Sequence, residues 1–351
     1  MYIAEYQGIN SFLVGSSKIL IEHGVTRRTR GYDCVELPEP FMFKLSNPTS
    51  RIITIGNRHW NPILPYAESL WLASGCNDLN LVSHYLKKIS EFSDDGCYLR
   101  GGYGPRLRGF SGIADDYKVG LSEKHQRKTV IDVDQFKYIY LSFQRDINTR
   151  QAVINIVDPP KDYFDIDGNL KFTKDFPCTQ ILQLQKQPQS NKLNLTVYMR
   201  SNDFLWGASA VNIFNYTFLQ EYFSQMLGLE VGEYFHIANN FHYYKNFEGK
   251  VYELANLSIK DYIDDDYKYN KSFDSFEAFE QMLQTLKSKE MDFRMKSNKE
   301  LIDFQDDFFN DWQKVFHVYN FREKLEFANP TLNKIRTYAK TTEGERNCSR
   351  K

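Results

Sequence analysis

The chain lacks the features that mark membrane, secreted and zinc-binding proteins. No apolar run approaches the about 18 residues of a membrane span. The N-terminus has no basic segment followed by an apolar stretch, so we expect no signal peptide. The five cysteines are odd in number and irregularly spaced, with no CxxC pair. We therefore expect free thiols, a cytoplasmic protein and no metal site.

An excess of charge of one sign is also missing. Lys and Arg number 44 against 45 Asp and Glu, so nothing indicates an obligatory nucleic-acid partner. An anionic ligand would have to be bound by a few well-placed arginines. Apolar residues make up 42% of the chain, with 27 Phe and 23 Tyr, which predicts a sizeable core. No fixed-period repeat or Ser/Gly-rich linker divides the chain.

Apolar periodicity predicts helices and strands in mixed order. Alternation is clearest at 193–199, and the helix at 212–227 should end at Gly228. Residues 135–143 fit a helix or a strand. The other expected elements are strands around a turn in 41–55, a helix at 65–72, a loop at 93–103 and a strand at 152–157.

The C-terminal third differs in composition from the rest. Residues 234–244 predict one strand, which would place His236, Asn240, His242 and Tyr244 on one face. From about residue 261, Asp, Glu and Lys increase and apolar residues recur at helical spacing. We predict a catalytic domain at 1–260 and a helical extension at 261–351 packed on it, with a loose end at 341–351.

Cys178 and Arg200 are the first candidates for chemistry. Cys178 follows a proline near a strand start, and Arg200-Ser201 comes at the end of the 193–199 strand. An arginine beside a thiol stabilises the thiolate that a nucleophilic cysteine needs. Arginine and serine together also suit a phosphate. The alternative interpretations are an inert buried thiol and a surface Arg–Asp ion pair.

These residues belong to a series of blocks that resembles the thymidylate synthase family over roughly residues 20–250. The blocks follow the order of that family at close to its spacing. They are Arg28-Thr29, Glu68-Ser69-Leu70-Trp71, Tyr103-Gly104-Pro105-Arg106-Leu107-Arg108, Asn148-Thr149-Arg150, Pro177-Cys178 with Gln183, Arg200-Ser201-Asn202-Asp203, Gly207 with Asn212, and His242-Tyr243-Tyr244.

The resemblance implies a fold and a reaction. The fold would be α+β, with a large mixed sheet at a dimer interface and helices on its other face. The Cys178 thiolate would add to C6 of a pyrimidine nucleoside monophosphate and make C5 nucleophilic. C5 would attack 5,10-methylenetetrahydrofolate, which acts as co-substrate without a metal. Reduction by the folate would then give dTMP and dihydrofolate from dUMP.

The resemblance also implies a role for each residue. Glu68 would organise proton transfers, Tyr103 would lie near Cys178 and the base, and Asn212 would read the base edge. A homodimer would share Arg150 across its interface. The remaining roles are phosphate binding by Arg28, Arg200, Ser201 and the partner's Arg150; sugar binding by His242 and Tyr244; a further substrate contact by Gln183; and folate contacts by Asp203, Ile89 and Phe92.

Departures from the family leave several functions open. Thr179 replaces the usual histidine, Gln151 replaces a second arginine, and one extra residue separates Asp203 from Asn212. The tryptophans beside the folate are replaced by Ile89 and Phe92, and a looser wall could admit water, which gives a hydroxymethyl product. The alternatives to methylation of dUMP are therefore a hydroxymethylase acting on dUMP, dCMP or CMP, a nucleotide-binding paralogue without turnover, and an unrelated α+β protein. An amide at Asn212 favours uracil over cytosine.

Overall fold

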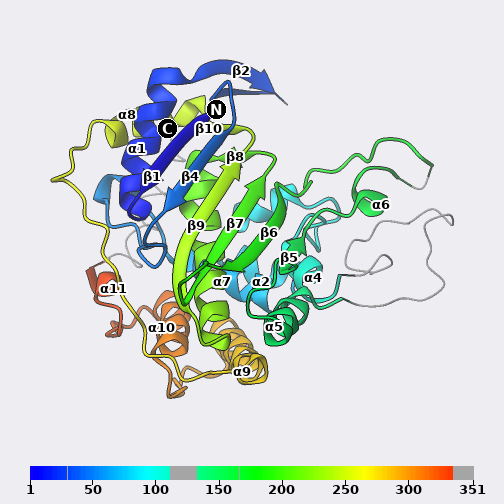
Figure 1. The fold of residues 1–351 in the computed structure, drawn as a ribbon, viewed down its shortest axis with the longest axis vertical. Helices are drawn as coiled ribbons and strands as arrows, with labels where there is room; N and C mark the ends of the chain where they lie inside the picture. The colour runs from blue at the N-terminus through cyan, green and yellow to red at the C-terminus, as the bar shows by residue number, and fades with distance from the viewer. Residues whose placement is uncertain (30, 111–132, 166, 335–351) are drawn as a thin grey trace.

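A computed structural model describes residues 1–29, 31–110, 133–165 and 167–334. Its centre is a six-stranded mixed sheet in the order β1-β4-β9-β7-β6-β5 (Figure 1). The strands are β1 (Tyr2–Tyr6), β4 (Phe41–Leu45), β9 (Glu230–Ala238), β7 (Lys192–Met199), β6 (Thr179–Lys186) and β5 (Val153–Asn155). The pairs β1–β4 and β7–β9 are parallel, and the others are antiparallel. Together with the helices this is the expected α+β fold.

A second sheet of four short strands continues from the first, in the order β2-β3-β10-β8. Its strands are β2 (Val25–Thr29), β3 (Tyr32–Glu36), β10 (Phe241–Tyr244) and β8 (Asn202–Asp203). It is reached twice from the central sheet, because β7 leads into β8 and β9 leads into β10. Both crossings bring residues expected to bind substrate into the smaller sheet.

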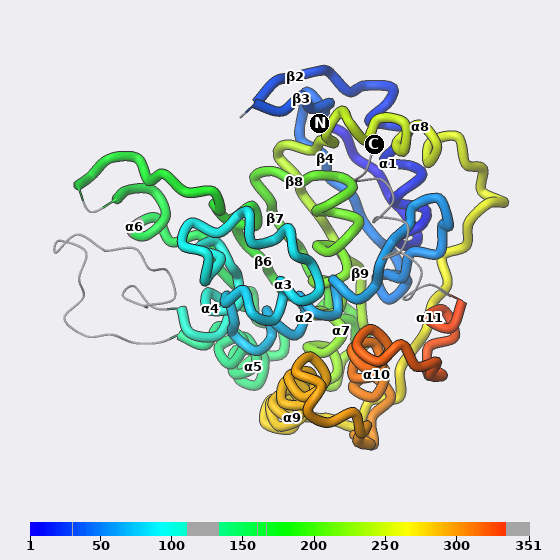
Figure 2. The backbone as a smooth tube through the Cα atoms, turned by 180° about the vertical axis from the view of Figure 1, so that it is seen from behind, coloured from blue at the N-terminus to red at the C-terminus, as the bar shows by residue number. Residues whose placement is uncertain are grey.

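The helices gather on one face of the central sheet. Figure 2 shows α7 and α2 in front of the central strands, whereas Figure 1 shows the same strands from their other face, which no described helix crosses. The helices are α1 (Ile9–His23), α2 (Ile63–Ala73), α3 (Leu79–Tyr85), α4 (Tyr103–Arg108), α5 (Gln135–Arg145), α6 (Pro159–Asp162), α7 (Ile213–Met226), α8 (Glu248–Ala255), α9 (Phe276–Met295), α10 (Asp307–Phe321) and α11 (Pro330–Lys334).

Alternation along the strands explains the two faces. In β7, Leu193, Leu195, Val197 and Met199 are buried beneath the helices, and the residues between them are more exposed. The α7 helix is buried on nearly all sides and ends as expected before Gly228, which has φ +65 and suits the left-handed position after a helix. Segment 135–143, open to two interpretations, is helical within α5.

Two expected strands differ from the structure. In 41–55 only β4 is a strand, and residues 51–55 are irregular. The expected 234–244 strand breaks at Asn239–Asn240, where the chain leaves the central sheet for the smaller one. The break reverses the alternation, so His236 is fully buried against Phe43 while His242 is half-buried. The predicted shared face is therefore wrong for His236.

The region after residue 260 packs on helices α2 and α7. Residues 261–274 are not helical, and α9 and α10 follow. Phe308 stacks on Phe218 at 4.3 Å, and Trp312 Nε1 donates to Tyr66 O at 2.9 Å. The domain boundary at 260 stays a prediction, and the expected loose end at 341–351 lies outside the described residues.

A buried charged cluster secures this region. Glu221 of α7 forms ion pairs with Arg51 Nη2 at 2.6 Å and with Lys271 Nζ at 2.9 Å, and all three residues are almost fully buried. The two cations hold the pKa of Glu221 below its usual value in spite of its burial. The cluster therefore joins the segment before α9 to the central helix.

Among the described residues, no helix combines the length and the apolar character that a membrane span requires.

Candidate active site

Cys178 and Arg200 face each other at the start of β6 and the end of β7. Their backbones pair, with Arg200 N donating to Cys178 O at 2.9 Å. The guanidinium Nη2 lies 3.6 Å from Cys178 Sγ and also donates to Phe176 O at 3.0 Å, while Nε donates to Pro177 O at 2.9 Å. The arginine is thus fixed by the backbone that precedes the cysteine. A fixed positive charge beside a half-buried sulfur favours the thiolate.

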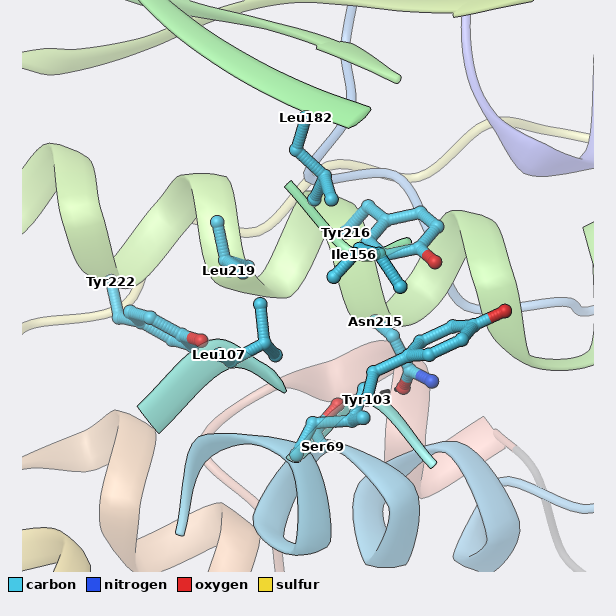
Figure 3. Close-up of a pocket in the computed structure, with 10 residues that line it drawn as sticks. Ser69, Tyr103, Leu107, Ile156, Leu182, Asn215, Tyr216, Leu219 and Tyr222 are labelled. Atoms are coloured by element: carbon cyan, nitrogen blue, oxygen red, sulfur yellow. Dashed lines mark hydrogen bonds between the residues drawn. The ribbon is translucent and has the colours of Figure 1, made fainter. Parts of the chain in front are cut away.

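Two tyrosines hold the residue after Cys178. Thr179 N donates to the hydroxyl of Tyr103, from α4, at 3.1 Å, and Thr179 Oγ1 bonds to the hydroxyl of Tyr216, from α7. Figure 3 shows the two rings extending in the same direction, with their hydroxyls at the same end. Burial raises the pKa of Tyr103, and negative charge on Cys178 raises it further. Tyr103 is therefore a neutral phenol beside the sulfur.

A glycine fixes α4 against the segment before Cys178. Gly101 N donates to Asp175 Oδ2 at 2.8 Å, and a Cβ at Gly101 would lie 2.7 Å from Asp175 O. A side chain would therefore push the two segments apart. The contact positions Tyr103, two residues later, toward Cys178.

Glu68 lies on α2, where α2 meets α7. Asn215 Nδ2 of α7 donates to Glu68 Oε2 at 3.0 Å, and Ser69 Oγ donates to Asn215 Oδ1 at 2.9 Å. Burial raises the pKa of Glu68 to about 7, and the bond from Asn215 opposes that rise. Ser69, Asn215, Tyr103 and Tyr216 line one small pocket (Figure 3). The carboxyl group of Glu68, which titrates near neutral pH, can accept or return a proton beside this pocket.

The segment from Asp203 to Asn212, where we expected one extra residue, contains a π-helix, Phe204–Asn212. Insertions of this kind often mark functional sites. Asp203 caps it, accepting from the backbone N–H groups of Trp206 and Gly207. Burial raises the pKa of Asp203 to about 6, and its Oδ2 is buried without a hydrogen-bond partner in the described ranges. Asn212 is the last residue of the π-helix.

The smaller sheet carries the residues expected to bind the phosphate and the sugar. Arg28 is exposed on β2, and His242 and Tyr244 are half-buried on β10 with their rings 5.5 Å apart. Ser201 Oγ donates to Asn240 Oδ1 at 3.0 Å. Asn240 Nδ2 in turn donates at 2.8 Å to Glu36, the cross-strand neighbour of His242. Glu36 therefore connects the expected phosphate and sugar contacts.

Four predicted residues lie apart from this group. Gln183 alternates with the pocket residue Leu182, so it lies on the sheet face without helices, where its Nε2 donates to Arg150 O at 3.2 Å. Arg150 is exposed there. Ile89 and Phe92 lie in the short 3-10 helix Lys87–Phe92, and Phe92 is 54% exposed. The predicted contacts of these four residues with substrates stay predictions.

The sequence interpretation missed the polar partners. Asn202 lies in one of the quoted blocks, and Asn215 and Tyr216 lie in the helix predicted at 212–227, but no role was expected for any of them. Asn215 carried the clearest signal, because an amide within an otherwise apolar helix needs a hydrogen-bond partner. No local sequence pattern indicated a role for Glu36, because its hydrogen-bond partner Asn240 lies far away in the sequence.

Comparison with known families agrees with this geometry. The model of the thymidylate synthase family matches residues 13–309. The chain belongs to the thymidylate synthase family. The resemblance inferred from the sequence blocks is therefore confirmed. The match also includes α9 and the start of α10, beyond the blocks that carried the resemblance.

Relatives within this family fall in two groups. The chain is 33% identical over 225 residues to a deoxyuridylate hydroxymethyltransferase of Bacillus phage SP01, covering 64% of this chain and 54% of that protein. It is 29% identical over 236 residues to one of Pseudomonas phage M6, covering 67% and 59%. A thymidylate synthase of Bacillus licheniformis is 30% identical over 152 residues, covering 43% and 48%. The chain thus spans about half the length of the curated relatives that it matches.

Proposed function

We propose that this family member transfers a one-carbon unit from 5,10-methylenetetrahydrofolate to C5 of deoxyuridylate, and that the product carries a hydroxymethyl group. The observation that carries the one-carbon chemistry is the 3.6 Å contact between Arg200 Nη2 and Cys178 Sγ. It supplies a thiolate nucleophile next to a pocket that also holds a neutral tyrosine. Glu68, one helix away, supplies a carboxyl group that titrates near neutral pH.

The proposed reaction begins at C6 of the uracil ring. The thiolate of Cys178 forms a bond to C6, and the electron pair of the C5–C6 double bond moves to C5 and O4. C5 then forms a bond to the methylene carbon of the folate, and the bond from that carbon to N10 breaks as N10 takes a proton. Glu68, through water, accepts the proton from C5, and the remaining bond between the methylene carbon and N5 breaks. Tetrahydrofolate leaves, and an exocyclic methylene remains on the ring.

Addition of water to this methylene, followed by loss of Cys178 from C6, gives 5-hydroxymethyl-deoxyuridylate and tetrahydrofolate. The two phage relatives named as deoxyuridylate hydroxymethyltransferases support this ending. The exposed Phe92 in the expected folate wall also supports it, because an incompletely covered intermediate is open to water. Methylation is the second candidate, since the Bacillus licheniformis relative is named a thymidylate synthase. In that case hydride from the folate reduces the methylene.

The proposal includes a homodimer with composite sites. The central sheet leaves one face without helices in the described residues, and Ile181, Tyr198 and Arg150 are exposed there. Burying this face against a second copy would remove apolar surface from water. Arg150 would then reach the nucleotide phosphate of the partner copy, beside Arg28, Arg200 and Ser201.

Product analysis tests the proposal. The full chain is incubated with deoxyuridylate and methylenetetrahydrofolate, and the nucleotide product is identified by mass spectrometry. Formation of dihydrofolate, followed by absorbance, would instead indicate methylation. Cys178→Ser should abolish turnover, whereas the matched control Cys97→Ser, at an exposed thiol, should not. Unchanged turnover in Cys178→Ser would overturn the mechanism, and absence of a covalent adduct with 5-fluorodeoxyuridylate and folate would favour a binding protein without turnover.

A further inference from the structure

Asn202 makes a buried contact with the residue expected to read the base. It lies on β8, is 2% exposed, and its Nδ2 donates to Asn212 Oδ1 at 2.8 Å. Its own Oδ1 is buried without a partner in the part of the chain that the structure describes. The amide nitrogen is therefore the group of Asn202 that is committed to a neighbour. The neighbour, Asn212, is half-buried at the end of the π-helix.

The contact is held from both sides. The backbone of Asn202 is fixed by pairing of β8 with β10, and its N–H donates to Asn240 O at 2.8 Å. Gly207 lies against both amides, because a Cβ there would be 2.9 Å from Asn202 Nδ2 and 2.9 Å from Asn212 Oδ1. Glycine thus allows the two side chains to approach each other. Backbone pairing and the absence of a side chain at Gly207 together place the Asn202 amide against Asn212.

We propose that Asn202 fixes the orientation of the Asn212 amide and thereby makes the site select uracil over cytosine. This inference rests on the proposed function, in which Asn212 contacts the base edge. Uracil presents an N3–H donor and an O4 acceptor, whereas cytosine presents an N3 acceptor and an N4 amino donor. An amide that is free to rotate by half a turn can match either base. An amide whose oxygen is already directed toward Asn202 Nδ2 can match only one of them.

Two substitutions at Asn202 should lower the preference for uracil to different extents. Asn202→Ala removes the donor, so the amide of Asn212 becomes free to turn and discrimination should weaken. Asn202→Asp replaces the donor with an acceptor, which favours Asn212 Nδ2 on its side and turns the amide toward the cytosine pattern. Both changes act on base selectivity through Asn212, so Asn202 is a positioning residue.

Binding of deoxyuridylate and deoxycytidylate to the full chain, measured by calorimetry, tests this inference. Wild type should prefer deoxyuridylate. Asn202→Ala should reduce the ratio of the two affinities by about tenfold, because one wrongly oriented hydrogen-bond pair has about that effect. Asn202→Asp should reduce it further or invert it. The matched control is Asn191→Asp, at an exposed asparagine on the β6–β7 turn, which should leave the ratio unchanged.

A second background separates orientation from general structural damage. In Asn212→Asp the carboxylate presents two equivalent oxygens and has no orientation to fix, so adding Asn202→Ala should not change the ratio further. If Asn202→Ala weakens both nucleotides equally and leaves the ratio at its wild-type value, the inference is wrong. The ratio of the two affinities in Asn202→Ala tests the inference even if Asn202→Asp does not fold. Failure of the wild type to bind either nucleotide would instead reject the proposed function.

Discussion

The hydrogen bond from Asn215 to Glu68 gives the most direct test of how the site controls protons. Asn215→Leu keeps most of the side-chain volume and removes the donor that lies 3.0 Å from Glu68 Oε2. Burial has already raised the pKa of Glu68 to about 7, and this bond opposes the rise. Without it, the pKa should rise further and the carboxylate should be less populated at neutral pH.

The size of the effect follows from the bond. Hydrogen bonds to charged groups contribute about 1.5–3 kcal/mol, and about 1.4 kcal/mol corresponds to one pH unit. Because the Glu68 side chain is partly accessible to solvent, we take the lower end and expect a rise of about one pH unit. The titratable groups that line the adjacent pocket are Tyr103, Tyr216 and Tyr222, whose pKa values burial raises, so they stay neutral in this range.

The assay is release of tritium from C5-labelled deoxyuridylate in the presence of the folate, measured against pH. In Asn215→Leu the acidic limb of the profile should move to higher pH, with a loss of about fivefold at neutral pH that recovers in alkali. The control is Thr217→Val, also on α7, whose hydroxyl donates to the carbonyls of Ile213 and Phe214 in its own helix. An unmoved acidic limb, or an equal loss at every pH, would refute the role of Asn215 through Glu68.

Three further predictions concern stability and assembly. Glu68→Gln should be more stable than wild type by about 1 kcal/mol at alkaline pH, and equally stable below pH 4.5, the ordinary pKa of a glutamate. The reason is that the wild-type protein loses stability as Glu68 ionises with a pKa of about 7. Urea unfolding at a series of pH values measures this difference, and parallel stability curves for the two proteins would contradict it. Mixing inactive Cys178→Ser and Arg150→Glu chains should restore about a quarter of wild-type turnover if the arginine crosses a dimer interface, and none if it acts within its own chain. Glu221→Ala should cost about 3–5 kcal/mol in urea unfolding, because it leaves two cations buried without their partner, whereas a loss below about 1 kcal/mol would show that the cluster is hydrated.

Local patterns were sufficient where one segment determines its own structure. The alternation in β7 and the glycine after α7 were both interpreted correctly, since each depends only on neighbouring residues. The break at Asn239–Asn240 could not be predicted in this way. Nothing in that short apolar sequence indicates that its two halves pair with different sheets. Pairing depends on β3 and β4, which are distant in the sequence.

In the candidate site, too, some features could be predicted from the sequence and others depended on distant residues. The pairing of Cys178 with Arg200 was expected because a series of ordered blocks supported it, and the structure places the two side chains in contact. The polar partners of those blocks were not expected. Asn202 and Asn215 act on residues of other segments through single hydrogen bonds, and a single sequence does not reveal such pairs. The π-helix follows the same rule, since an extra residue can be accommodated in several ways.

Under the proposed function, the helices after residue 260 would influence which product is formed. The 3-10 helix Lys87–Phe92, the expected folate wall, follows α3 directly. Helix α3 is held by α9 and α10, because His84 Nε2 bonds to Asn320 Oδ1 at 2.8 Å and Tyr85 donates to Glu290 Oε1 at 2.8 Å. The cysteine and its arginine are held instead by β6, β7 and α7. A change in α9 or α10 should therefore alter how well the folate wall excludes water while leaving the addition of Cys178 to the base intact.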